Sequence, residues 1–224
     1  MIAWVHERAA ASGASEVLVA TDDERIARAA AAHGARVEMT GTHHESGTDR
    51  IAEVAERLGW PDEHIVVNVQ GDEPLVPPEL IAQVAGLLAR HPDAAIATLT
   101  TPVRSPEELT DPGTAKVVAD RTGRALYFSR APIPWSRDGD RPDAPRRHIG
   151  LYAYRVRDLK RISAEPPCAL ELAERLEQLR ALWLGMQIVV EDAVVPPARG
   201  VDTVADLDEI RAAVARLSAA RPGA

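Results

Sequence analysis

The sequence predicts an α/β domain with a mostly parallel sheet, helices on both of its faces, and a small antiparallel insertion. Two observations carry this prediction. Short runs of β-branched residues alternate with helical stretches over the first hundred residues, as in a parallel sheet. Beyond about residue 103 the spacing shortens to that of a hairpin, which indicates antiparallel strands. The 224 residues suit one domain over 1–224, with the insertion at about 105–155.

The first half of the chain supplies the alternating elements. Buried strands are expected over 16–21, 64–69 and 94–99. Helices are expected over 1–12, 23–32, 48–58 and 77–90. Thr48 and Pro77 suit first helical turns, and Gly34 and Gly59 suit helix ends. Spacing of this kind favours helices that cross from one strand to the next.

The second half begins with the insertion. Strands at 115–119 and 125–129 flank a turn that contains Gly123, which predicts a hairpin. A further strand is expected over 148–154, helices over 156–164 and 170–184, a strand over 187–191 and a last helix from about Thr203.

Composition narrows the class of protein. The formal net charge of −8 makes general nucleic-acid binding a poor fit. The single cysteine, Cys168, allows no disulfide within the chain and no cysteine-based metal site. No apolar run approaches the roughly 20 residues that span a bilayer, and the first residues do not resemble a signal peptide. We therefore expect no membrane partner and a cytoplasmic location.

Asp72 is the first candidate for chemistry. It follows the expected strand at 64–69 within the run Gln70-Gly71-Asp72-Glu73-Pro74. Ligands of open α/β sheets bind beyond the carboxyl ends of strands, and Mg²⁺ prefers one or two carboxylates there. The simpler interpretation is a solvated turn. A second carboxylate, Asp202 in Gly200-Val201-Asp202-Thr203, favours a magnesium pair, although Asp202 or Thr203 can equally be a helix N-cap with Asp206.

Other candidates lie at the ends of expected elements. Ser46, Gly47 and Thr48 begin a helix, where amides and hydroxyls suit an anion or a base edge, or simply form an N-cap. Arg130 ends a strand and can fork onto a carboxylate. Glu171, Glu174 and Glu177 recur at three-residue steps and would share one helix face, which is usually solvated.

Six motifs in one order resemble those of the 3-deoxy-manno-octulosonate (Kdo) cytidylyltransferases, over nearly the whole chain. The motifs are Ser46-Gly47-Thr48-Asp49-Arg50, Val67-Asn68-Val69-Gln70-Gly71-Asp72-Glu73-Pro74, Ala125-Leu126-Tyr127-Phe128-Ser129-Arg130, Arg147-His148-Ile149-Gly150-Leu151-Tyr152, Leu176-Glu177-Gln178-Leu179-Arg180 and Gly200-Val201-Asp202-Thr203. The resemblance implies a fold like that of the nucleotide-diphospho-sugar transferases. It also implies a magnesium-dependent reaction of CTP with Kdo that gives CMP-Kdo and pyrophosphate for lipopolysaccharide biosynthesis.

The resemblance also implies roles for particular residues. Asp72 and Asp202 are expected to hold Mg²⁺ and to be the catalytic pair. Gln70 and the Ser46-Gly47-Thr48 turn are expected beside the nucleotide and the sugar. Arg130, His148, Glu177 and Gln178 are expected to line the Kdo pocket. The family implies a homodimer in which the antiparallel insertion supplies much of the contact.

In one respect the chain departs from this family. The family opens with a strand and a loop of the form P-A-R-x-x-S-x-R-L-P-G-K, and Met1-Ile2 matches the start of the family's first helix. We therefore expect the sequence as given to lack that strand and loop, and to bind CTP weakly. Two alternatives stay open: an enzyme that activates sialic acid or 8-amino-Kdo with CTP, and a truncated homologue without activity.

Overall fold

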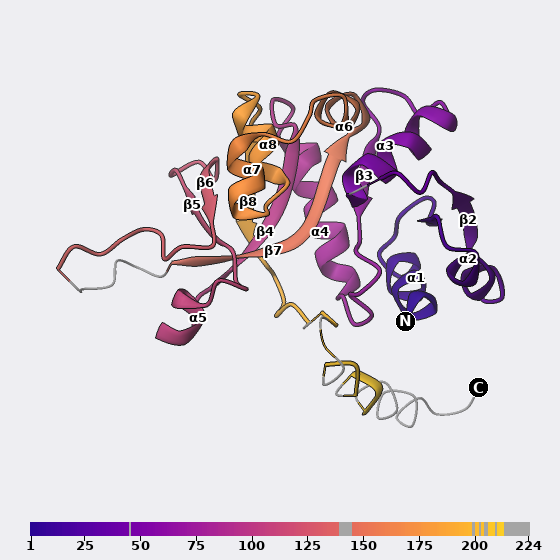
Figure 1. The fold of residues 1–224 in the computed structure, drawn as a ribbon, viewed down its shortest axis with the longest axis horizontal. Coiled ribbons are helices and arrows are strands. Elements are labelled where there is room, and N and C mark those ends of the chain that lie inside the picture. The colour runs from indigo at the N-terminus through magenta and orange to yellow at the C-terminus, as the bar shows by residue number, and fades with distance from the viewer. Residues whose placement is uncertain are drawn as a thin grey trace.

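The long strand β7 (Arg146–Arg155) organises the central sheet of the computed structural model, which describes residues 1–44, 46–138, 145–198, 200–201, 203, 206–208 and 210–212. Along one edge β7 is antiparallel to β4 (Ile96–Pro102). Its other edge pairs with β3 (Ile65–Asn68) and, nearer its start, with β5 (Lys116–Ala119). The strand therefore joins β3 to the hairpin in one sheet (Figure 1).

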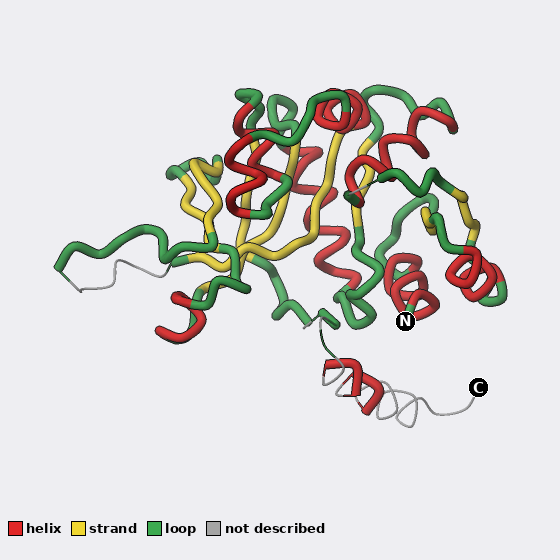
Figure 2. The backbone as a smooth tube through the Cα atoms, in the orientation of Figure 1, coloured by secondary structure: helices red, strands yellow, loops and turns green. Residues whose placement is uncertain are grey.

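The remaining strands extend this sheet or lie beside it. β6 (Ala125–Ser129) completes an antiparallel hairpin with β5, as the sequence predicts. β8 (Ile188–Asp192) runs parallel to β4. β1 (Leu18–Thr21) and β2 (Arg36–Met39) form a separate parallel pair. Figure 2 shows this pair set apart from the larger sheet.

The α/β class is confirmed, but the sheet is mixed rather than mostly parallel. β3, β4 and β8 share one direction, because β7 is antiparallel to β3 and β4 and β8 is parallel to β4. The strand expected at 148–154 inserts between β3 and β4 against that direction. The local run of apolar residues could indicate a strand there, but it could not indicate its neighbours.

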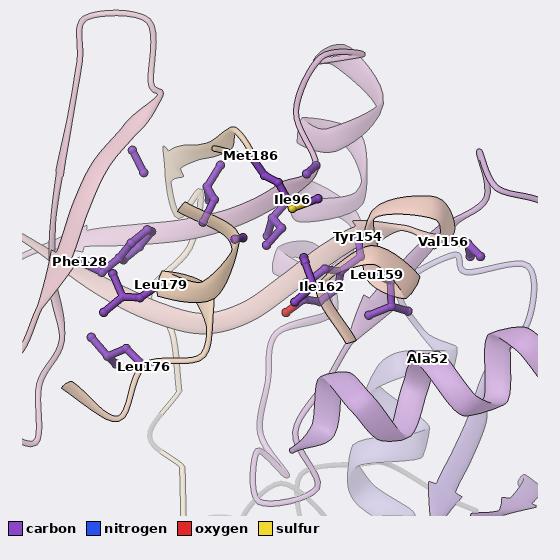
Figure 3. Close-up of a cluster of buried hydrophobic side chains, with 14 of the residues drawn as sticks. Ala52, Ile96, Phe128, Tyr154, Val156, Leu159, Ile162, Leu176, Leu179 and Met186 are labelled. Atoms are coloured by element: carbon purple, nitrogen blue, oxygen red, sulfur yellow. The ribbon is translucent and has the colours of Figure 1, made fainter. Parts of the chain in front are cut away.

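Helices cover both faces of the sheet, also as predicted. On one face α4 (Pro78–Arg90) packs with Ala97, Leu99 and Ala153. On the other face α3 (Gly47–Arg57), α6 (Val156–Ser163) and α8 (Gln178–Trp183) pack around Ile96, Tyr154 and Phe128 (Figure 3). Neighbours in sequence, such as Ile96 and Ala97, enter opposite clusters because side chains of a strand alternate between faces.

The other helices lie at the periphery. α1 (Ile2–Ala10) contacts α4 and α2 (Glu24–Ala31), α5 (Pro106–Thr110) precedes β5, and α7 (Ala169–Glu174) precedes α8. The sequence did not predict β2 or α5. Residues 206–208 and 210–212 are helical, in the region where a last helix is expected. Among the described helices, none has the length and apolarity that a membrane crossing requires.

The helix expected over 170–184 is in fact two helices. α7 ends at Glu174, Arg175 adopts the left-handed conformation with φ 53° and ψ 48°, and α8 begins at Gln178. The expectation that Glu171, Glu174 and Glu177 share a solvated face is therefore wrong. Each carboxylate has a different protein partner: Arg180 for Glu171, Ser129 for Glu174 and Thr48 for Glu177.

Candidate active site

Two of the predicted residues lie at the carboxyl end of β3. Past Asn68 the chain leaves the sheet, and the Glu73 amide donates to the Gln70 carbonyl at 3.2 Å, which closes a turn. Gln70 and Asp72 are both exposed on this turn. The Asp72 carboxylate has no hydrogen bond or ion pair with any residue in the described part of the chain. An exposed carboxylate of this kind suits Mg²⁺, which takes one or two protein carboxylates and keeps phosphate and water oxygens.

The segment that carries the second candidate passes against Asp72. The Val201 amide donates to the Asp72 carbonyl at 2.9 Å. A Cβ at position 200 would lie 2.9 Å from Glu73 Oε1, so a residue larger than glycine there would displace the Glu73 side chain. Asp202 itself lies outside the described residues, and its carboxylate is not placed. Its chain neighbour Val201 is nevertheless tied directly to the Asp72 turn.

The capping interpretation of the following residues is confirmed. The Thr203 amide donates to Asp206 Oδ2 at 2.8 Å, and the Asp206 amide donates to Thr203 Oγ1 at 3.2 Å. This reciprocal pair is a capping box, which satisfies two amides at a helix N-terminus. Thr203 thus has a structural role.

The Ser46-Gly47-Thr48 turn comes close to the end of β3. Ser46 is the N-cap of α3: its Oγ accepts from the Asp49 amide at 3.1 Å and donates to Asp49 Oδ2 at 2.9 Å. A Cβ at Gly47 would lie 3.3 Å from Asn68 Nδ2 and 3.8 Å from Gln70 Nε2. The N-terminus of α3 therefore lies beside the end of β3 from which the Asp72 turn extends.

On the other side of this turn, Thr48 meets Glu177. Thr48 Oγ1 donates to Glu177 Oε2 at 2.9 Å and lies 3.4 Å from the Tyr154 hydroxyl. Desolvation of the carboxylate raises the pKa of Glu177, although its side chain keeps an exposed part. Desolvation likewise raises the pKa of Tyr154. Two predicted residues, Thr48 and Glu177, are thus brought together from positions far apart in the sequence.

His148 continues this polar and aromatic cluster. Its ring lies edge-on to Phe128 at 5.1 Å and 5.3 Å from Tyr152, between ring centroids. His148 Nε2 is 3.0 Å from Thr98 Oγ1, and the Thr98 hydroxyl can donate to the carbonyls of Ile149 and Leu151. We therefore assign the proton to Nε2, which donates to Thr98. Desolvation lowers the pKa of His148 to about 3, so the ring is neutral at physiological pH.

This lowered pKa predicts a loss of stability in acid. Unfolded His148 takes up a proton near its ordinary pKa of 6.5, whereas the folded ring does so only near 3. The free energy of unfolding should therefore fall as the pH drops below 6.5, by about 2.5 kcal/mol between about pH 7 and pH 4.5 for this one group. Urea unfolding of the wild type and of His148→Gln at about pH 7 and pH 4.5 measures it. Glu177 titrates with the opposite sign but is present in both proteins, so equal losses in the two would contradict the prediction.

Most hydrogen-bond donors of Arg130 already bind backbone carbonyls of the chain, which its predicted role did not include. Its Nε donates to the Glu174 carbonyl at 2.6 Å, its Nη1 to the Pro112 carbonyl at 2.7 Å, and its Nη2 to the Arg175 carbonyl at 3.3 Å. Part of the Nη2 group is left without a hydrogen-bond partner among the described residues. These carbonyls occupy most of the guanidinium group, so a carboxylate cannot pair with its whole edge while they stay bound.

Gln178 follows Glu177 in the sequence, and its side chain is buried. It is only 4% exposed, and its Nε2 has no hydrogen-bond partner within the described residues. A buried amide donor without an acceptor costs free energy, and such groups are rare in native proteins. The observation suits a residue that meets an acceptor on a ligand.

Sequence reasoning missed a buried ion pair that supports this region. Arg180 donates to both oxygens of Glu171 at 2.8 and 2.6 Å, and Glu171 is only 7% exposed. Arg180 Nη1 also lies 3.7 Å from Asp49 Oδ1, on the cap of α3. The pair thus links α7 and α8 to the Ser46 turn. Arg180 stands three residues after Glu177 in the sequence, and this arginine beside an acidic repeat could have indicated an ion pair. The sequence pattern alone does not identify Glu171 as its partner.

A cleft of about 900 Å³ opens beside the Asp72 edge, between β1 and β3. Three predicted residues, Ser46, Gly47 and Gln70, line it, together with apolar side chains of α1 and α4 such as Val5 and Ile81. The Thr48–Glu177–His148 cluster is not among its lining residues. The predicted residues therefore form two groups that meet at the Ser46-Gly47-Thr48 turn: one at the edge of β3 and one on the sheet face covered by α3, α6 and α8.

The chain is similar in sequence to cytidylyltransferases from several organisms. It is 57% identical over 216 residues to the 3-deoxy-manno-octulosonate cytidylyltransferase of Thioalkalivibrio sulfidiphilus, covering 94% of this chain and 86% of the relative. It is 52% identical to the enzyme of that name from Vibrio campbellii, covering 96% and 88%.

Solved structures agree with these sequence relatives. A CMP:2-keto-3-deoxy-manno-octonic acid synthetase complexed with CTP superposes with a TM-score of 0.88 at 40% identity, over 96% of this chain and 87% of that one. A 4-diphosphocytidyl-2C-methyl-D-erythritol synthase, at 14% identity and a TM-score of 0.61, shares the fold. The sequence profile of the cytidylyltransferases matches residues 1–188. The chain belongs to the cytidylyltransferase family.

Proposed function

We propose that this chain is a magnesium-dependent cytidylyltransferase that activates Kdo with CTP, a step of lipopolysaccharide biosynthesis. The anomeric hydroxyl oxygen of Kdo forms a bond to the α-phosphorus of CTP, the bond to the β-phosphate oxygen breaks, and the products are CMP-Kdo, pyrophosphate and a proton. The observation that carries the proposal is the meeting of the Asp72 edge and the Thr48–Glu177 cluster at one turn. The names of the relatives support the same chemistry.

The Asp72 edge is assigned to the phosphates. Asp72 and Asp202 would hold Mg²⁺, which when bound neutralises phosphate charge and orients the reacting groups. Ser46, Gly47 and Gln70 line the cleft beside it, and the free amides at the start of α3 suit an anionic or polar edge of the nucleotide. The exposed, unpartnered state of the Asp72 carboxylate supports this assignment.

The Thr48–Glu177 cluster is assigned to the sugar. Thr48, His148, Glu177 and Gln178 offer hydroxyl, imidazole, carboxylate and amide groups, which suit the many hydroxyls of a sugar acid. Neutral His148 can serve as a hydrogen-bond partner but adds no positive charge. The free part of Arg130 Nη2 supplies the cation for the sugar carboxylate.

Two further assignments belong to this proposal. Because CTP is a cytoplasmic metabolite, we place the reaction in the cytoplasm. We also propose a homodimer formed through the insertion at about 105–155, where Leu126 and Trp135 are 59% and 79% exposed. Large exposed apolar side chains of this kind are typical of contact surfaces. Sedimentation velocity would report the oligomeric state.

Release of pyrophosphate tests the function. The chain is incubated with CTP, Mg²⁺ and one of three sugar acids: Kdo, 8-amino-Kdo or a sialic acid. We expect Kdo to give the highest kcat/KM. A higher value for either competitor would replace the proposed sugar, and absence of turnover with all three, by a folded chain that binds CTP, would favour the non-catalytic alternative.

A further inference from the structure

The connection between α7 and α8 contains an unusual backbone conformation. Arg175 has φ 53° and ψ 48°, and it is the only residue other than glycine with a positive φ in the described part of the chain. A residue with a Cβ in this left-handed region is disfavoured by a factor of about 5–30 relative to an ordinary conformation. Something else in the structure must compensate for that cost.

The Arg175 side chain does not compensate. It is exposed, and it makes no hydrogen bond or ion pair with any other described residue. The backbone around it is held instead. Arg130 donates through Nε to the Glu174 carbonyl at 2.6 Å and through Nη2 to the Arg175 carbonyl at 3.3 Å. The Arg175 amide donates to the Glu171 carbonyl at the end of α7.

The left-handed turn separates two carboxylates that a continuous helix would keep together. Residues three apart in an α-helix point within about 60° of each other. Here Glu174 accepts from Ser129 Oγ at 2.7 Å and from the Arg130 amide at 2.9 Å, at the end of β6. Glu177 accepts from Thr48 at the start of α3, at 2.9 Å. The turn at Arg175 is what sends the second carboxylate toward α3.

We propose that Arg175 is a positioning residue whose left-handed backbone aims the Glu177 carboxylate at Thr48 and so shapes the sugar side of the site. The proposal rests on the proposed function, because that function assigns Glu177 to the sugar. Arg175 touches no reacting group. Its backbone conformation sets the direction in which α8 begins, and that direction sets the position of Glu177.

Three substitutions at this position separate backbone from side chain. Arg175→Gly removes the side chain and favours the left-handed region. Arg175→Ala removes the side chain but leaves the backbone cost as it is. Arg175→Val introduces a β-branched residue that strongly opposes this region. If Arg175→Val is recovered only in aggregated form, Arg175→Thr, which is also β-branched but polar, takes its place.

Steady-state kinetics and crystallography supply two independent readouts. We expect Arg175→Gly and Arg175→Ala to keep the KM values of the wild type. Arg175→Gly should also unfold with an equilibrium constant about fivefold lower. Arg175→Val should raise the KM for Kdo about 5- to 30-fold while changing the KM for CTP little. In its crystal structure, Thr48 Oγ1 and Glu177 Oε2 should lie beyond hydrogen-bonding distance.

The outcomes distinguish this proposal from the proposed function. A helix end without a positioning role predicts lower stability for Arg175→Val but equal effects on both KM values, or an unchanged Thr48–Glu177 contact. Either result overturns the inference. If the wild type does not use Kdo at all but the contact breaks only in Arg175→Val, the positioning role stands and the proposed function fails.

Discussion

Replacing Asp72 by alanine should lower turnover with CTP and Kdo by about three orders of magnitude. The carboxylate is proposed to hold Mg²⁺ against the triphosphate. A bound metal ion supplies several kcal/mol of charge stabilisation, and each 1.36 kcal/mol is a factor of ten in rate. Asp202→Ala is expected to act alike, because the chain beside it is hydrogen-bonded to Asp72 through Val201. Pyrophosphate release at saturating Mg²⁺ measures both variants.

The same substitution should leave the fold intact. Asp72 is exposed, and its carboxylate has no partner in the described part of the chain. Asp93→Ala removes another exposed carboxylate, in the turn that precedes β4, and is the matched control. It should keep full activity. Turnover near that of the wild type in either Asp72→Ala or Asp202→Ala would refute the metal assignment.

Replacing Arg130 by alanine should raise the KM for Kdo by about 30-fold or more, with a much smaller change in the KM for CTP. Loss of a desolvated charge pair costs roughly 2–5 kcal/mol of binding, and the pair is proposed to form with the sugar carboxylate only. Arg130→Lys keeps the positive charge but lacks the planar guanidinium group, so its KM for Kdo should lie between those of the wild type and Arg130→Ala. Arg121→Ala, in the exposed turn of the β5–β6 hairpin, is the control for charge alone.

Arg130 also holds the backbone of Glu174, Arg175 and Pro112, so stability has to be measured alongside. Thermal unfolding without substrate separates the role of Arg130 in the fold from its role in binding the sugar. Loss of its hydrogen bonds to the backbone lowers Tm even when no substrate is present. An equal rise of both KM values would mean that the side chain serves the fold and not the sugar.

Local patterns were sufficient for much of the fold. The hairpin expected at 115–119 and 125–129 matches β5 and β6, because a two-strand unit with a glycine turn is specified within about fifteen residues of sequence. The N-cap at Ser46 and the exposed turn at Asp72 follow in the same way from neighbouring residues.

Features set by distant parts of the chain could not be predicted. No local signal places β7 between β3 and β4, because strand order depends on which edges meet after folding. Residues 170–184 contain no proline or glycine, so their pattern favours one helix. The break at Arg175 arises where Arg130 reaches the helix from β6. Tertiary contacts outweighed helix propensity at that position.

In the candidate site too, features that depend on neighbouring residues could be predicted, and contacts between distant residues could not. Asp72, Ser46 and Gly47 were accessible to sequence reasoning because each ends or begins an element. The contacts of Thr48 with Glu177 and of His148 with Thr98 join residues 129 and 50 positions apart, and no pattern encodes such pairs. The buried Glu171–Arg180 pair was hidden by an acidic repeat that looked solvated.

The separation of β1 from β3 has a consequence for how the molecule opens. Among the described strands β1 pairs with β2 and β3 pairs with β7, so no ladder of hydrogen bonds crosses the cleft between them. The β1–β2 pair has its own small core of Val19, Ala30 and Ala35. A unit that no strand pairing joins to the larger sheet, and that is held by helix packing and by bonds from Arg50 and Arg57 of α3, can detach at a free energy below that of global unfolding. In native-state hydrogen exchange, amides of β1 and β2 should therefore exchange together and well before those of β4 and β7. The side of the site that is proposed to bind the phosphates lies along that boundary.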